Sequence, residues 1–118
     1  MNPRASESLG SLASLHLLRA EYRVSLNQPV ESEILKGLAA ADRALQINPQ
    51  TAEVISTRAM LFLLRARSYT GKERKKFAQD AEASFLQALK INNSLTKKYG
   101  GLLNEARQLT ETQGPPDK

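Results

Sequence analysis

The feature of this sequence that most constrains its fold is an octapeptide that occurs twice. Residues 13–20 read ASLHLLRA and residues 59–66 read AMLFLLRA, with six of the eight positions identical. A second pair of matching segments, ALQIN at 44–48 and ALKIN at 88–92, follows at almost the same spacing. Internal repeats with periods of roughly 20–50 residues are typical of stacked structural units. The repetition therefore predicts two copies of one unit.

The two pairs of matches differ slightly in spacing, which is 46 residues for the octapeptide and 44 for the second segment. Length changes are tolerated in surface loops rather than in packed elements, so we expect a loop between two helices within each copy. Turn-forming residues stand in those places, in NQPV at 27–30 and SYTGK at 68–72. Each copy is therefore predicted to be a helical hairpin.

Apolar residues recur at helical spacing along the chain. On the first predicted helix, one stripe includes Ala13 and Ala20, and a second consists of Leu15, Leu18 and Tyr22. A helix with two apolar stripes is expected to pack against neighbours on both sides, as in a stacked array. The predicted helices span residues 7–26, 29–47, 51–68, 71–91 and 94–112, between disordered tails at 1–6 and 113–118.

The composition favours a helical protein. Leu and Ala dominate the apolar residues and Trp is absent, whereas strands draw on β-branched and aromatic residues. The chain has no cysteine, which excludes disulfides and thiolate metal sites. Its longest apolar run, residues 60–64, is far shorter than the ~20 residues of a membrane span. We expect an all-α cytoplasmic protein with no membrane partner.

The hairpins resemble tetratricopeptide repeat (TPR) units. In that family the first helix of a unit carries a bulky, a small and an aromatic residue, and here Ile55, Ala59 and Phe62 have that spacing. The corresponding positions of the other helices are Leu9, Ala13 and His16, then Gly37, Ala41, Ala44 and Pro49, then Ala81, Phe85 and Ala88, then Tyr99, Leu102 and Ala106. The repeat is ten to twelve residues longer than the family's unit of roughly 34.

The resemblance implies a short right-handed solenoid of antiparallel helix pairs. Its domain would span residues 7–112, with units at 7–49 and 50–93 and a capping helix at 94–112. A weaker resemblance, carried by LLRA and ALQINP, is to the C-terminal TPR region of bacterial eukaryotic-like serine/threonine protein kinases. It implies a signalling scaffold that follows a kinase domain in a larger protein.

TPR domains are non-catalytic modules that bind proteins, and their exposed first-helix side chains line a concave groove for peptides or helices. Carried over to this sequence, the resemblance implies a partly apolar peptide groove. Its lining would be Leu17, Leu18, Met60, Leu63, Leu64, Arg67, Lys97, Asn104 and Arg107. An exposed apolar strip of this kind is also compatible with burial against a missing repeat or a second copy, so a homodimerisation module is an alternative.

No pattern for catalysis or cofactor binding is present in the sequence. His16, the single histidine, occupies the place that Phe62 holds in the second copy, so we expect it to be a packing residue with a polar edge. Without a second histidine or a cysteine, no zinc site is expected. The chain is therefore not expected to be an enzyme, and neither a metal nor a cofactor is expected.

The most charged segment, RARSYTGKERKK at 65–76, is a candidate basic patch in a chain of net charge +5. The patch would consist of Arg65, Lys72, Arg74, Lys75 and Lys76. The simpler interpretation is a solvated, extended connection whose long side chains cover apolar neighbours. The alternative is a surface for an acidic ligand or nucleic acid. With Tyr69 as its only aromatic residue, the segment lacks a stacking platform, which disfavours nucleic acid as a partner.

Overall fold

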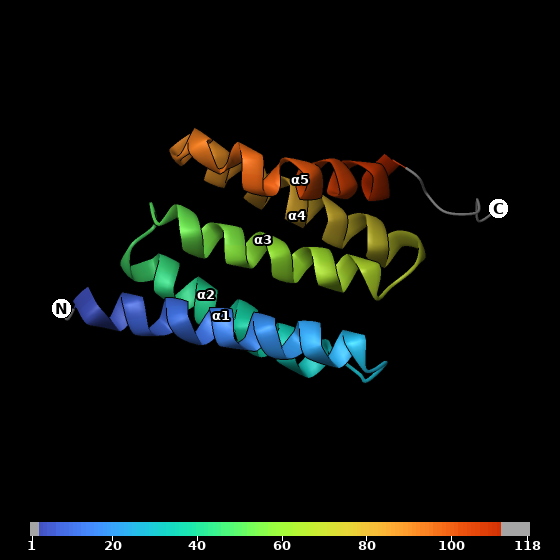
Figure 1. The fold of residues 1–118 in the computed structure, drawn as a ribbon, viewed down its shortest axis with the longest axis horizontal. Helices are drawn as coiled ribbons and strands as arrows, with labels where there is room; N and C mark the ends of the chain where they lie inside the picture. Colours follow the sequence, from blue (N-terminus) through green and yellow to red (C-terminus); the bar gives the residue numbers. More distant parts are fainter. Residues whose placement is uncertain (1–2, 112–118) are drawn as a thin grey trace.

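The computed structural model describes residues 3–111, which form five α-helices and one short 3-10 helix. These elements are α1 (Pro3–Ser25), α2 (Glu31–Ile47), α3 (Ala52–Arg67), α4 (Gly71–Ile91), η1 (Asn93–Leu95) and α5 (Thr96–Glu111). In Figure 1, α1, α3 and α5 form a front layer, and α2 and α4 lie behind it. The described residues contain no strand, and the predicted all-α class with helices packed in neighbouring pairs is confirmed.

The start of α1 differs from the prediction. Residues 3–6 belong to α1, so the prediction of a disordered tail over 1–6 is wrong for these four residues. Pro3 suits the first turn of a helix, where its missing N–H has no intrahelical acceptor. The buried Ser6 hydroxyl donates a hydrogen bond to the Ala44 carbonyl oxygen at 3.3 Å, which ties this end of α1 to α2. The tail predicted for 113–118 and the helix end predicted at 112 lie outside the described residues.

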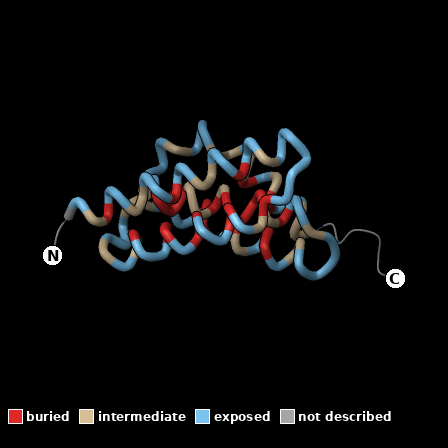
Figure 2. The backbone as a smooth tube through the Cα atoms, turned by 90° about the horizontal axis from the view of Figure 1, so that it is seen from below, coloured by how far each residue is buried: buried red, intermediate tan, exposed pale blue. Residues whose placement is uncertain are grey.

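Small residues allow close packing within each hairpin. Ala13 of α1 is buried against Ala41 and Ala44 of α2, and its counterpart Ala59 of α3 is buried in the main core with Ala81 of α4. Figure 2 shows the buried residues gathered along the middle of the molecule, with exposed residues on the outside. The duplicated octapeptide therefore places its alanines in equivalent surroundings, on the first helix of each hairpin facing the second.

The second hairpin stacks on the first through α3 and α2. Leu61 is buried directly on Gly37, where an added Cβ would lie only 2.9 Å from Leu61 Cδ1. Two ion pairs flank this contact: Arg58 Nε lies 2.7 Å from Asp42 Oδ1, and Arg65 Nη2 lies 2.6 Å from Glu31 Oε2.

The main core includes buried residues from all five α-helices. Phe85 of α4 is fully buried there, with its ring centroid 5.8 Å from that of Tyr99 in α5. Leu103 and Ala106 are the buried residues of α5. The last helix thus packs against α4 of the second hairpin, and its role as a capping helix stays a prediction.

Candidate interaction surface

The apolar part of the predicted groove is smaller than the sequence suggested. Leu18 is 62% exposed, and Leu17 and Met60 are half-buried against the main core. Leu63 and Leu64 are buried, so the prediction that they line an exposed groove is wrong. The reason is that α3 is the central helix and packs against α1, α2 and α4, which leaves little of its apolar surface free.

The polar part of the predicted groove is mostly engaged within the chain. Arg67 binds Glu105 through two hydrogen bonds, Nε to Oε2 at 2.7 Å and Nη2 to Oε1 at 2.6 Å. This pairing lowers the pKa of the Glu105 carboxyl and raises the pKa of the Arg67 guanidinium. Arg107 Nε lies 3.3 Å from Glu82 Oε2. These arginines fasten α5 to α3 and α4. Of the four polar groove residues, Lys97 and Asn104 are exposed and form no such bond within residues 3–111.

The predicted basic patch is divided between two helices. Residues 65–67 end α3 and residues 71–76 begin α4, so the prediction of an extended connection over 65–76 is wrong. Arg65 is paired with Glu31 and stacks over the Phe77 ring at 4.1 Å. Arg74 donates to the carbonyl oxygens of Tyr69 at 2.7 Å and Ala66 at 3.2 Å. Only three members of the patch, Lys72, Lys75 and Lys76, lack a partner among residues 3–111.

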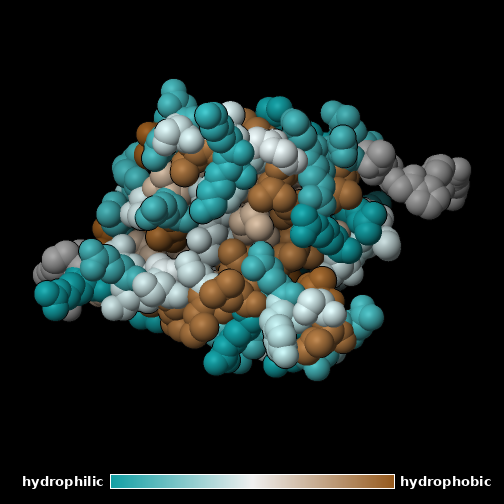
Figure 3. Space-filling model, viewed as in Figure 1, coloured by the Kyte–Doolittle hydropathy of each residue, from teal (hydrophilic) through white to brown (hydrophobic). Residues whose placement is uncertain are grey.

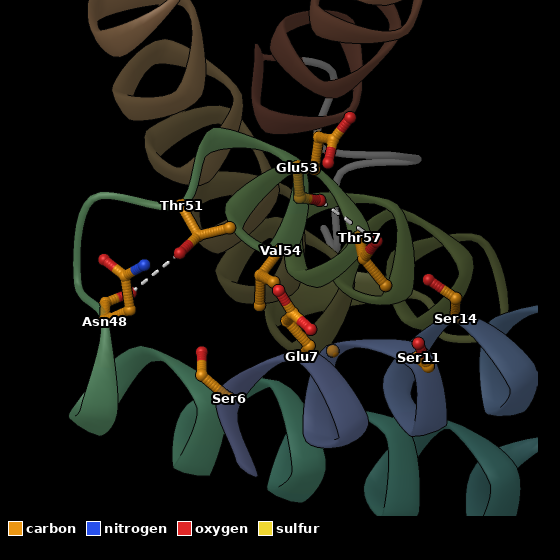
Figure 4. Close-up of a pocket in the computed structure, with 10 residues that line it drawn as sticks. Ser6, Glu7, Ser11, Ser14, Asn48, Thr51, Glu53, Val54 and Thr57 are labelled. Carbon is orange, nitrogen blue, oxygen red and sulfur yellow. Dashed lines mark hydrogen bonds between the residues drawn. The ribbon is translucent and has the colours of Figure 1, made fainter. Parts of the chain in front are cut away.

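A polar pocket that was not predicted from the sequence lies between α1 and α3, with a volume of about 510 Å³ (Figure 4). Its lining residues are Ser6, Glu7, Gly10, Ser11, Ser14, Asn48, Thr51, Glu53, Val54 and Thr57. The helices approach closely at Gly10, where an added Cβ would lie 3.0 Å from Val54 Cγ2. Short side chains on both walls leave the space open. The available signal was the recurrence of small residues at 6, 10 and 14, which is one stripe of a helix.

The pocket is rich in hydrogen-bond acceptors and negative charge. The hydroxyls of Ser6, Thr51 and Thr57 donate to the backbone carbonyls of Ala44, Asn48 and Glu53, which leaves their oxygens free to accept. The carboxylates of Glu7 and Glu53 form no ion pair within residues 3–111. None of the described residues that line the pocket is cationic. The pocket therefore suits an ammonium or guanidinium group, although the whole chain carries a net charge of +5.

An apolar patch adjoins this pocket on the α1/α3/α5 face. We define the apolar patch as Leu17, Leu18 and Met60. These residues lie one helical turn beyond the pocket residues Ser14 and Thr57, because positions three and four apart share a helix face. Figure 3, which views the face formed by α1, α3 and α5, shows apolar side chains gathered over α1 and beside α3. A polar pocket and an apolar patch thus follow one another along the same pair of helices.

A histidine–carboxylate pair, with Glu33 buried and His16 partly buried, joins α1 to α2. His16 Nδ1 lies 2.8 Å from Glu33 Oε1, and Arg23 Nε lies 3.6 Å from Glu33 Oε2. His16 is packed with a polar edge, as predicted, but nothing in the sequence singled out Glu33 as its buried partner. The hydrogen bond from His16, aided by the charges of His16, Arg19 and Arg23, lowers the pKa of the Glu33 carboxyl, although burial opposes this effect.

Replacing Glu33 with glutamine should remove a pH-dependent part of the stability. The folded-state pKa of Glu33 is below its unfolded value, so its contribution is present at neutral pH and is lost as pH falls through the folded pKa. Glu33→Gln should therefore melt below the parent at pH 7, and the two should converge as the solution becomes acidic. Thermal unfolding followed by circular dichroism at several pH values measures this. Glu111→Gln, at an exposed site, is the control, and a constant gap between Glu33→Gln and the parent would contradict the assignment.

Three further observations bear on function. No group of three or more metal-ligating side chains within residues 3–111 could hold a metal ion. None of the described helices is both long and apolar enough to cross a membrane. No protein-family model, curated protein or solved structure matches this chain. A functional assignment therefore depends on the chemistry of the α1/α3/α5 face.

Proposed function

We propose that this chain is a non-catalytic protein-interaction module of the TPR type that holds an extended peptide across the face formed by α1, α3 and α5. The observation that carries the proposal is the acceptor-rich pocket of about 510 Å³ between α1 and α3, adjoined by the apolar patch. A lysine or arginine of the peptide would occupy the pocket, and an aliphatic side chain would rest on the patch. Together they would fix the peptide's position and direction.

The chemistry of the pocket supports a basic ligand rather than the acidic one that the sequence suggested. Glu7 is exposed and projects from α1 toward α3 (Figure 4), so it can approach a peptide cation without breaking a bond inside the chain. Arg67 and Arg107, by contrast, are already neutralised by Glu105 and Glu82. Because Glu7 and Glu53 are solvent-exposed, the attraction should be modest and weakened by salt.

The resemblance to TPR units and to the C-terminal region of bacterial eukaryotic-like serine/threonine kinases supports a finer proposal. The module would act in the cytoplasm as part of a signalling protein and would bring a protein partner to it. Its repeated hairpins, with Ala13 and Ala59 in equivalent positions, support the TPR part of this proposal. The full reading frame around this segment tests the kinase part, which requires a kinase domain upstream.

Selection from a random dodecapeptide library tests the binding proposal. Peptides that bind the chain should be enriched in a lysine or arginine close to an aliphatic residue. Ser14→Arg, which introduces a cation into the pocket, should weaken a selected peptide by about tenfold or more in fluorescence anisotropy. Ser32→Arg adds the same charge at an exposed position on α2 and should leave the affinity almost unchanged. Equal affinities for both variants, or selected peptides without basic residues, would reject the pocket as the binding site.

A further inference from the structure

The side of α1 that points away from the rest of the molecule carries an uncovered apolar stripe. Its members are spaced three or four residues apart, and each is substantially exposed. They are Leu12, Leu15, Leu18, Tyr22 and Leu26, with Leu18, which borders the apolar patch and belongs to both surfaces, at 62% and Tyr22 at 66%. They lie on the opposite side of the helix from Ala13 and Ala20, which are buried. We call these five residues, together with Arg19, the outer face of α1.

The second hairpin shows what covers the same positions. The octapeptide repeat makes Leu15 equivalent to Leu61 and Leu18 equivalent to Leu64. Leu61 and Leu64 are only 0% and 4% exposed, and Leu61 packs directly on Gly37 of α2. Side chains that are buried by a neighbouring helix in one copy are therefore left in solvent in the other.

The charges at this site repeat as well. Arg65 of α3 reaches across to Glu31 of α2, with Nη2 2.6 Å from Oε2. Its equivalent, Arg19, is exposed and has no ion pair among the described residues. Beside Arg19 lies a hollow of about 350 Å³, lined by Leu18, Arg19, Tyr22, Arg23, Gln28 and Glu33. The outer face of α1 thus offers an apolar stripe, a cation that forms no ion pair within residues 3–111, and room for the side chains of a covering helix.

We propose that the outer face of α1 is a docking surface for a helix with the chemistry of α2, supplied by a helical hairpin of a partner protein. Such a helix carries glycine or alanine where it meets Leu15 and a carboxylate that pairs with Arg19, as Gly37 and Glu31 do for Leu61 and Arg65. A second copy of this chain does not supply it. The matching face of its α2 is already covered by α3, and that of its α4, around Ala81, is buried in the main core.

A peptide of residues 29–48 is the probe, because it contains the whole of α2. A lactam bridge between the exposed positions 39 and 43 would hold it helical and leave the Gly37 side free. We expect the full chain to bind this peptide, measured by fluorescence anisotropy. Leu15→Asp and Arg19→Glu in the chain should each weaken binding by about tenfold or more, because they place a carboxylate against an apolar seat or against the peptide's Glu31. Leu86→Asp, at an exposed leucine of α4, is the matched control.

Two changes in the peptide locate the contact. A peptide with Gly37→Leu should not bind, because the new side chain fills the space at position 37 that Leu15 would occupy. A peptide with Glu31→Lys should bind the Arg19→Glu chain better than the parent chain, which a nonspecific apolar contact would not produce.

Two results would overturn the proposal. The first is an absence of binding, or binding that is indifferent to Leu15→Asp and Arg19→Glu. The second is a concentration-dependent dimer that Leu15→Asp dissolves, since a second copy would then cover this face. Ser14→Arg separates this proposal from the peptide pocket, because that variant should lose the selected peptides and still bind the α2 peptide.

Discussion

Replacing Phe85 with alanine should lower the free energy of unfolding by about 3–5 kcal/mol, the largest effect we expect from one substitution. Phe85 is the largest fully buried side chain, and it lies in the main core with Tyr99 of α5 beside it. Its removal would leave a cavity against Tyr99 and weaken the attachment of α5. Urea denaturation followed by circular dichroism at 222 nm measures the change.

The neighbouring leucine provides a matched control. Leu86 is next in the chain but 42% exposed, so Leu86→Ala should cost less than about 1 kcal/mol. If Phe85→Ala leaves the chain too unstable to measure, Phe85→Leu keeps most of the volume and should give a smaller loss, still larger than that of Leu86→Ala. Equal losses at positions 85 and 86 would show that Phe85 does not lie on the buried face of α4.

Replacing Gly37 with leucine should lower the free energy of unfolding by about 1–3 kcal/mol or more. The Cβ of the new side chain would lie 2.9 Å from Leu61 Cδ1 and 3.2 Å from His16 Cβ, so α3 could no longer pack as closely against α2. Helix propensity alone predicts the opposite sign, since leucine is favoured over glycine by up to ~1 kcal/mol inside a helix. The sign of the change, measured by urea denaturation, therefore shows whether the packing contact exists.

Gly101 is the control for this prediction. An added Cβ at Gly101 would meet no atom within 4 Å, so Gly101→Leu should follow helix propensity and stabilise the chain by up to ~1 kcal/mol. Gains in stability at both positions would mean that α2 and α3 do not meet at Gly37.

The hairpins were predicted well because both copies of the repeat pack their helices in the same way, so the same residue types recur at the packed positions. Ala13 and Ala59 are small for the same physical reason, which is the close approach of two helices, and both are buried. The second stripe of α1, with Leu15 and Leu18, also predicted a helix that packs on two sides. The structure shows that α1 does pack against both α2 and α3, but that no described helix covers Leu15 and Leu18, whereas the equivalent leucines of α3 are buried.

The surface was predicted less well because the groove lining was carried over from the TPR resemblance position by position, without regard to the number of helices around α3. Leu63 and Leu64 were expected in a groove, yet they are buried because α3 has neighbours on three sides. Predictions made from a run of charged residues fail for a similar reason. Arg65 binds Glu31, which lies 34 residues away in the sequence, and a local pattern carries no information about such a distant partner. The pocket depends on short side chains on two separate helices, and it exists only once α1 lies beside α3.

A disulfide between α1 and α3 tests most directly whether the two hairpins are stacked as equivalent copies. The chain has no cysteine, and an added Cβ at Gly10 would lie 3.0 Å from Val54 Cγ2, which places the two Cβ atoms close to disulfide geometry. The Gly10→Cys, Val54→Cys variant should form an intramolecular disulfide on oxidation and stay helical, and Leu12→Cys, Val54→Cys, with Leu12 on the outer face of α1, should not. Failure of the first pair to oxidise, or equal oxidation of both pairs, would contradict the stacked arrangement.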